Sequence, residues 1–260
     1  MTTPPLPAFA SAPQQEPAQP RLSEGARLVD VFIAPRKTFE DIRVNASWWV
    51  PWLLTTVLSV AFGAVAAQKI DMVQFTRQQI EQSKLAQRQM EQLSPEQQEQ
   101  QIRLRATITK IAFYVSPVFT LIFGLIVAAV LMGVFNFGFA AEVTFPQSLA
   151  IVFYAFLPRA ILAILLGLSL SVASDPNSIN IAGNPMPTNP GFFMDPQGNK
   201  FIYSLISYLD IFALWPVALL GLGFAAVSKN RKLTAGTGIT TMFVIYAILM
   251  LIGAGFKSAF

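Results

Sequence analysis

Two opposite charges lie inside long apolar stretches of this sequence, and they are the residues best placed to do chemistry. Arg159 follows Pro158 near the middle of one stretch, and Asp210 lies within the next. A charge that faces lipid costs about 3 kcal/mol on insertion scales, so we expect both side chains to face a bundle interior and to pair. Such a pair would either belong to a substrate or proton path or fix helix register. Tyr154 and Tyr208 could donate hydrogen bonds to the same cluster or could belong to interfacial belts.

Five apolar stretches are long enough to place these charges in a membrane. A bilayer core of about 30 Å needs roughly 20 apolar residues at 1.5 Å rise per residue. The composition agrees, because 53% of the residues are hydrophobic and 12% are charged, outside the usual range of soluble domains. The sequence therefore predicts an all-α polytopic membrane bundle with about five transmembrane helices. They cover approximately residues 48–67, 111–135, 148–173, 202–227 and 235–256.

Two polar segments separate the spans and differ in character. Residues 68–110 are rich in glutamine and contain no glycine. Ser94, Pro95 and Gln97 form the pattern of an N-cap with a capping box, which predicts a polar helical hairpin between spans one and two. Residues 174–200 are rich in proline and asparagine, so we expect an irregular, exposed loop. That loop has no EF-hand spacing, and no metal site is predicted.

The N-terminal region divides into a tail and a pre-span segment. Residues 1–22 are rich in proline and are expected to be disordered. Residues 23–47 are amphipathic, and they either lie in the headgroup region or pack on the bundle. A second basic group precedes the last span. The cations predicted to contact anionic lipid headgroups are Arg36, Lys37, Arg43, Lys229, Arg231 and Lys232.

Charge counts alone leave the orientation undecided. Five spans place eight of the 18 basic residues on the N-terminal side and nine on the other, with Arg159 in a span. Short loops weigh most in the positive-inside rule, and the short loop from Lys229 to Lys232 lies on the N-terminal side. We therefore expect a cytoplasmic N-terminus.

The composition lacks residues on which several classes of protein function usually depend. The chain has no cysteine and no histidine, which removes thiolate nucleophiles, Cys/His metal sites and the commonest general base. A membrane-embedded hydrolase or lipid transferase would need a nucleophile beside a base, but the serines and carboxylates are isolated. The net charge of +4 is dispersed around apolar spans, which argues against nucleic acid as a partner. We expect no enzymatic activity and no cofactor.

Four segments together resemble a known family. In chain order they are APRKTFEDI (34–42) leading to WWVPWLL (48–54), FPQSLAIVFYAFLPRAI (145–161), LDIFALWPVALLGLGFAAV (209–227) and the loop KNRK (229–232). This order is similar to the Yip family, the Ypt/Rab-interacting membrane proteins, in the form found in bacteria. The resemblance covers residues 28–256. One departure is the turn before span three, where the family usually has paired glycines and this chain reads Gly138, Phe139, Ala140, Ala141, Glu142.

The resemblance implies a five-span domain over residues 48–256, a cytoplasmic N-terminus and location in the bacterial cytoplasmic (inner) membrane. Eukaryotic relatives bind small GTPases, but the tail contains no motif that maps to that activity. The hypothesis is a non-enzymatic scaffold, assembly factor or membrane organiser. Its partners would be anionic lipid headgroups and a membrane or cytoplasmic protein held by the hairpin, and the chain could also form oligomers. The alternative is a small permease or channel that uses Arg159 and Asp210.

Overall fold

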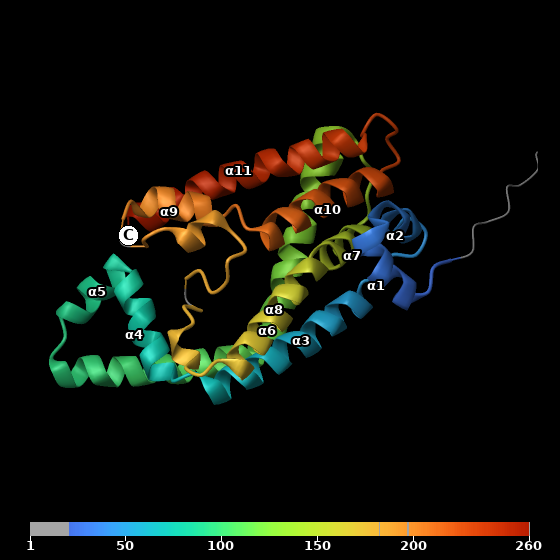
Figure 1. Ribbon diagram of the computed structural model, residues 1–260. Helices are drawn as coiled ribbons and strands as arrows, with labels where there is room; N and C mark the ends of the chain where they lie inside the picture. Colours follow the sequence, from blue (N-terminus) through green and yellow to red (C-terminus); the bar gives the residue numbers. More distant parts are fainter. Residues whose placement is uncertain (1–20, 182, 197, 260) are drawn as a thin grey trace, which may run out of the picture.

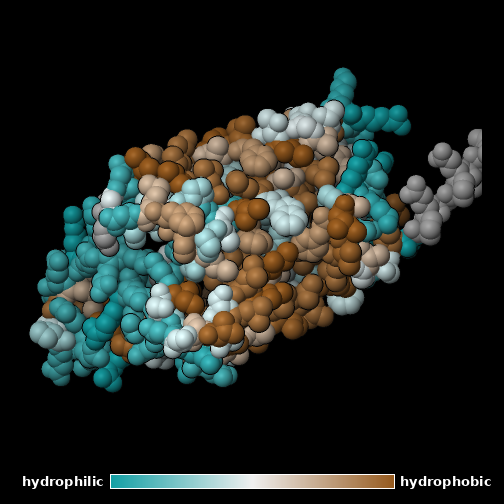
Figure 2. Space-filling model, viewed as in Figure 1, coloured by the Kyte–Doolittle hydropathy of each residue, from teal (hydrophilic) through white to brown (hydrophobic). Residues whose placement is uncertain are grey.

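The computed structural model describes residues 21–181, 183–196 and 198–259, and it is predominantly helical with no strand in these ranges (Figure 1). The predicted disordered tail, residues 1–22, lies almost entirely outside the described residues. Four helical segments are long and apolar enough to cross a membrane, and a bent pair makes a fifth when it is counted as one span. An apolar band separates two hydrophilic ends (Figure 2). The predicted polytopic membrane bundle is confirmed.

The spans are built from seven helices. Proline at the start of α8 separates it from α7, because Pro158 cannot continue the hydrogen-bond ladder of the preceding helix. A bend of 55° separates α9 from α10. In contrast, Pro117 lies inside an unbroken α6. The bounds are α3 Trp49–Lys69, α6 Pro95–Phe139, α7 Phe145–Ala155, α8 Leu157–Val172, α9 Lys200–Ser207, α10 Ile211–Val227 and α11 Ala235–Ala259.

The α10–α11 crossing shows why small residues recur in these spans. A Cβ atom added to Gly221 would lie 2.5 Å from the carbonyl oxygen of Gly238. The two helix backbones therefore touch at a point where only glycine fits. The apolar core continues beside this crossing, where the rings of Phe135 and Phe224 stack at 4.4 Å.

The polar segment after span one is helical and projects beyond the apolar band. Helix α6 has 45 residues, or about 67 Å at 1.5 Å rise, more than twice the bilayer core. Its polar first part is accompanied by α4 (Met72–Gln82) and α5 (Lys84–Glu91). The predicted capping box of Ser94 and Gln97 is present. Ser83 caps α5 as well, so the first arm of the hairpin consists of two helices.

The loop of residues 174–200 is irregular, as predicted, but it is not freely exposed. It contains two short 3-10 turns, η1 (Pro176–Ser178) and η2 (Pro190–Phe193). Asn189 is only 6% exposed. A Cβ atom on Gly191 would lie 2.2 Å from the Ser207 hydroxyl. The other described residues of the loop are exposed or half-buried, so the expectation of an exposed loop needs correction only where Asn189 and Gly191 pack against α9.

The pre-span segment forms two helices, α1 (Glu24–Ile33) and α2 (Pro35–Ile42), which pack against α7 and α10. Val31 and Phe39 are fully buried there. Of the two interpretations of this segment, the structure shows the packed one. We call the end of the bundle that holds α2 and the turn of residues 228–234 the basic end, and the end that holds α4 and α5 the hairpin end (Figure 1).

Candidate functional site: a groove at the basic end

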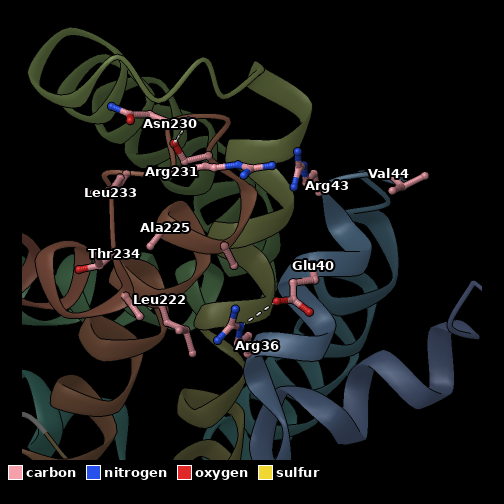
Figure 3. A pocket seen from close by; sticks show the side chains of 13 residues that line it. Arg36, Glu40, Arg43, Val44, Leu222, Ala225, Asn230, Arg231, Leu233 and Thr234 are labelled. Atoms are coloured by element: carbon pink, nitrogen blue, oxygen red, sulfur yellow. Dashed lines mark hydrogen bonds and ion pairs between the residues drawn. The ribbon is translucent and has the colours of Figure 1, made fainter. Parts of the chain in front are cut away.

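Three arginines from two distant segments surround one cavity of about 640 Å³ at the basic end. Arg36 and Arg43 come from α2 and its C-cap, and Arg231 comes from the turn between α10 and α11. Leu222 and Ala225 of α10 provide the apolar part of the lining (Figure 3). The predicted headgroup-contacting residues thus include three that share one site, which we call the basic groove.

Arg43 is held in place through its backbone. Its amide donates to the carbonyl of Phe39 at 3.2 Å, and its carbonyl accepts a bond of 2.9 Å from the side chain of Gln147. Gln147 is also the capping-box residue of α7, because its side-chain oxygen accepts from the Thr144 amide at 2.9 Å. The first turn of span three therefore fixes the point from which the Arg43 side chain extends.

The turn that carries Arg231 is fixed in a similar way. The Asn230 side chain donates to the Phe139 carbonyl at 2.7 Å and accepts from the Lys232 amide at 3.0 Å. The Ser228 hydroxyl donates to the Ala141 carbonyl at 3.2 Å. These bonds join the turn to the chain before α7, so both arginines extend from backbone that is tied to the same end of the bundle.

The charges around the groove are unbalanced. Glu40 is the acidic residue of the lining, and it is engaged by Arg36 at 2.7 Å. Arg43 and Arg231 form no ion pair with any described residue, and their guanidinium groups point toward one another (Figure 3). Three arginines and one glutamate leave a formal charge of +2 on the lining. Guanidinium groups bind phosphate and carboxylate oxygens in bidentate fashion, so the groove is suited to an anion.

The other predicted headgroup contacts lie outside the groove. Lys37 forms an ion pair of 2.9 Å with Asp30, and Lys229 forms one of 3.2 Å with Glu142. Lys232 is exposed on the same turn as Arg231. All six cations lie at the basic end, and three of them, Arg36, Lys37 and Lys229, already have acidic partners.

The expected pair of Arg159 and Asp210 is not present. Asp210 caps α10 and accepts from the Phe212 amide at 2.8 Å, and its other carboxylate oxygen accepts from Thr188 and Asn189. This correction has a physical reason: the break between α9 and α10 frees amide groups that need a cap. Arg159 lies elsewhere and lines a cavity between α3, α6 and α8.

The two predicted tyrosines lie in different environments. The Tyr154 hydroxyl donates to Glu24 at 2.9 Å. The Tyr208 carbonyl accepts from the Tyr246 hydroxyl at 2.7 Å, and Lys257 lies over the Tyr208 ring at 5.2 Å from its centroid. The four residues expected in one polar cluster therefore do not form one.

A buried charge cluster that sequence reasoning missed lies between α1, α2 and α7. Arg27 is fully buried and forms ion pairs with Asp41 and, at 3.5 Å, with Glu24. The Thr38 hydroxyl donates to the Arg27 carbonyl at 3.3 Å. The spacing of Glu24 and Arg27, three apart on a helix, was the available signal. It reveals neither the burial nor the third partner, Asp41.

Comparison with known proteins gives one match. The Yip1 domain matches residues 29–255, which include α2, the turn with Arg231 and all the spans except the last four residues of α11. No curated protein and no solved structure matches the chain. The family match and the apolar helices agree with the resemblance seen in the sequence, and the chain belongs to the Yip1 domain family as an integral, multi-pass membrane protein.

Proposed function

We propose that this protein is a non-enzymatic membrane organiser, which gathers anionic lipids at its basic end and acts as a scaffold or assembly factor for a protein partner. The single observation that carries the proposal is the convergence of Arg36, Arg43 and Arg231 on one groove. Cations dispersed over a surface attract anionic lipids only through the general field. Cations that are fixed around a cavity can, in addition, bind one headgroup selectively.

The location of the groove supports a lipid ligand. Its lining combines arginines with Leu222, Ala225 and Leu233, and it lies at the basic end of the bundle, beyond the apolar band that separates the two hydrophilic ends (Figure 2). A headgroup at that level keeps its chains in the hydrocarbon while its phosphate meets the arginines. We place the basic end in the cytoplasm, and the protein in the bacterial cytoplasmic membrane. The short basic turn supports this orientation by the positive-inside rule.

The hairpin end offers the surface for a protein partner. Glu99 accepts from Arg77 at 2.5 Å and from Arg103 at 3.0 Å, which joins α4 to α6. Most of the other polar side chains on these helices point to solvent. A rigid polar hairpin beyond the bilayer is suited to hold a partner without changing the packing of the spans.

The alternative is a small permease or channel. One observation favours it: Arg159 makes no ion pair with a described residue, and it lines a second cavity of about 430 Å³ between α3, α6 and α8. In that case Arg159→Gln would abolish transport in reconstituted vesicles while the variant stayed monodisperse. The organiser hypothesis predicts that Arg159→Gln leaves lipid recruitment at the basic end unchanged.

The proposal is tested by purifying the full chain from native membranes and measuring its bound lipids and cross-linked partners. We expect anionic lipids to be enriched in wild type and reduced when Arg43 and Arg231 are both changed to glutamine. The matched control, Lys37→Gln with Lys229→Gln, removes two cations at the same end outside the groove and should retain most of the enrichment. Deleting residues 68–110 should remove the protein partners and spare the lipids. Equal lipid loss in both double variants, or unchanged partners without the hairpin, would contradict the proposal.

A further inference from the structure

Two like charges face each other across the basic groove, and the described residues provide no anion between them. Arg43 and Arg231 repel one another, yet hydrogen bonds tie the backbone of each turn in place. The nearby acids are engaged elsewhere, Glu40 by Arg36 and Glu142 by Lys229. The arrangement is therefore complete only when an external anion lies between the guanidinium groups.

We infer that this anion is the phosphate monoester headgroup of a lipid of the phosphatidic acid class. The inference rests on the proposed function and names its ligand. The groove lining has a formal charge of +2, and a phosphate monoester carries about −1.5 to −2 near pH 7. A phosphodiester headgroup carries a single negative charge and offers fewer free oxygens, so it leaves one guanidinium uncompensated.

The start of α11 adds donors on the same side of the groove. Thr234 and Ala235 are part of the lining, and α11 begins at Ala235. The first amide groups of a helix have no acceptor within it and lie at the positive end of its dipole. The Thr234 hydroxyl accepts from the Thr237 amide at 3.1 Å and forms a hydrogen bond of 3.0 Å with the Thr237 hydroxyl, and neither bond uses the amide groups of Ala235 and Gly236. A phosphate between the arginines would thus meet positive potential from a third direction.

The apolar part of the lining selects a lipid over a soluble phosphate ester. Leu222, Ala225 and Leu233 form that part, and Val44, which also lines the groove, is 72% exposed. A glycerol backbone with acyl chains would cover these surfaces, whereas a free phosphate ester would leave them in contact with water.

The binding should depend on pH in a way that identifies the ligand. The second pKa of a phosphate monoester is about 6, so its second negative charge is lost as pH falls through that value. Arginine stays protonated throughout. The chain contains no histidine or cysteine. The charged groups of the lining are Arg36, Glu40, Arg43 and Arg231, while Glu142, Lys229 and Lys232 lie on the adjoining turns outside it. Free glutamate, lysine and arginine side chains titrate outside pH 5 to 8, so we assign a change of affinity in that window to the lipid.

The test is equilibrium binding of fluorescent phosphatidic acid and phosphatidylglycerol to the full chain in phosphatidylcholine nanodiscs. At about pH 7.5 we expect phosphatidic acid to bind about tenfold more tightly, and at about pH 5.5 we expect most of that preference to disappear. Arg231→Gln should weaken phosphatidic acid binding about tenfold. Lys232→Gln, on the same turn but outside the lining, should change it less than about twofold.

The contrary outcomes are distinct. Equal affinity for the two lipids, or a preference that does not respond to pH, would overturn the monoester assignment while leaving general recruitment of anionic lipids intact. Competition by glycerol 3-phosphate as effective as that by the lipid would overturn the lipid assignment in favour of a soluble ligand. The same loss in Arg231→Gln and Lys232→Gln would show that no specific site exists. Failure to bind either anionic lipid would contradict the proposed function itself.

Discussion

At the scale of single residues, the most consequential side chain is Arg27. It is fully buried, and its ion pairs with Glu24 and Asp41 join α1 to α2. Removing one partner from a buried ion pair leaves the other charge uncompensated, and the loss exceeds the value of the pair itself. The cluster therefore determines whether the two helices dock on the bundle.

We expect Arg27→Met to lower the free energy of unfolding by about 3 kcal/mol, because it leaves the Asp41 carboxylate, which is only 13% exposed, without its ion-pair partner. Thermal unfolding of the purified chain in detergent measures the loss. The double variant Arg27→Met with Asp41→Asn removes both charges and should recover much of the stability. Arg36→Met is the control, because the Arg36 side chain is 77% exposed in its ion pair and should contribute less than about 1 kcal/mol. Equal losses in Arg27→Met and Arg36→Met would contradict this role.

Residue patterns predicted local features well and tertiary partners poorly. The capping box at Ser94 was predictable because all its atoms belong to four consecutive residues. Asp210 was misinterpreted because residues 202–227 form one apolar run, which conceals the break that makes Asp210 a helix cap. Arg27 was missed because Asp41 lies 14 positions away, and no local pattern signals that contact.

At the scale of elements, helix α1 has an apolar outer face. The charges of Arg27 and Asp41 point inward between α1 and α2, while Val29 and Ile33 of α1 are 57% and 74% exposed on the outside. The ring of Phe32 meets that of Trp215 edge to face at 5.7 Å, and Trp215 lies within the bent fourth span. This arrangement is stable where the outer solvent is hydrocarbon.

A cysteine at position 29 tests this polarity directly, because the chain has no cysteine of its own. We expect Val29→Cys to resist a membrane-impermeant maleimide in sealed vesicles and to react once detergent dissolves the bilayer. Arg21→Cys, at the exposed start of the described chain, should react in vesicles of the orientation that exposes the basic end. Equal labelling of the two positions in intact vesicles would show that α1 lies in water.

The hairpin at the other end depends on Glu99. The hydrogen bond from Arg103, followed by the contact with Arg77, lowers the pKa of the Glu99 carboxyl below its ordinary value of 4.5. Because the folded-state pKa is lowered, the contact stabilises the hairpin at pH values above the ordinary pKa of the carboxyl. The stabilisation is lost as the pH falls through the folded-state pKa.

We therefore expect the α4–α6 separation to broaden as the pH falls below 4.5, measured between spin labels on introduced cysteines. Glu99→Gln should show the broad distribution at neutral pH. Glu96→Gln, one turn away in the first turn of α6, should behave as wild type. A separation that does not respond to pH in wild type would show that Glu99 does not join the two helices.

At the scale of the whole molecule, the length of the apolar stretches predicted the membrane bundle, and the order of the motifs predicted the family. Both predictions are confirmed. The packing of segments that are distant in the sequence could not be predicted from these patterns. Residues 43 and 231 are separated by four spans, and nothing local to either indicates a shared cavity. The common groove follows from the antiparallel order of the spans, which returns the chain to the basic end before α11.

Whether the basic groove lies on one face of the membrane depends on the bent pair α9–α10. If α9 and α10 cross the bilayer as one span, an even number of crossings separates α2 from the turn at Arg231, and both lie on one face. The organiser hypothesis depends on this arrangement, because a single headgroup must reach arginines from both segments.

The most direct measurement is cross-linking between Arg43→Cys and Arg231→Cys in native membranes, with a short bifunctional maleimide. We predict an intramolecular cross-link, and modification of both positions by an impermeant thiol reagent from the cytoplasmic side. The control pair, Arg43→Cys with Lys84→Cys at the hairpin end, should not cross-link. Labelling of positions 43 and 231 from opposite sides of the membrane, or a cross-link no stronger than that of the control pair, would contradict the account.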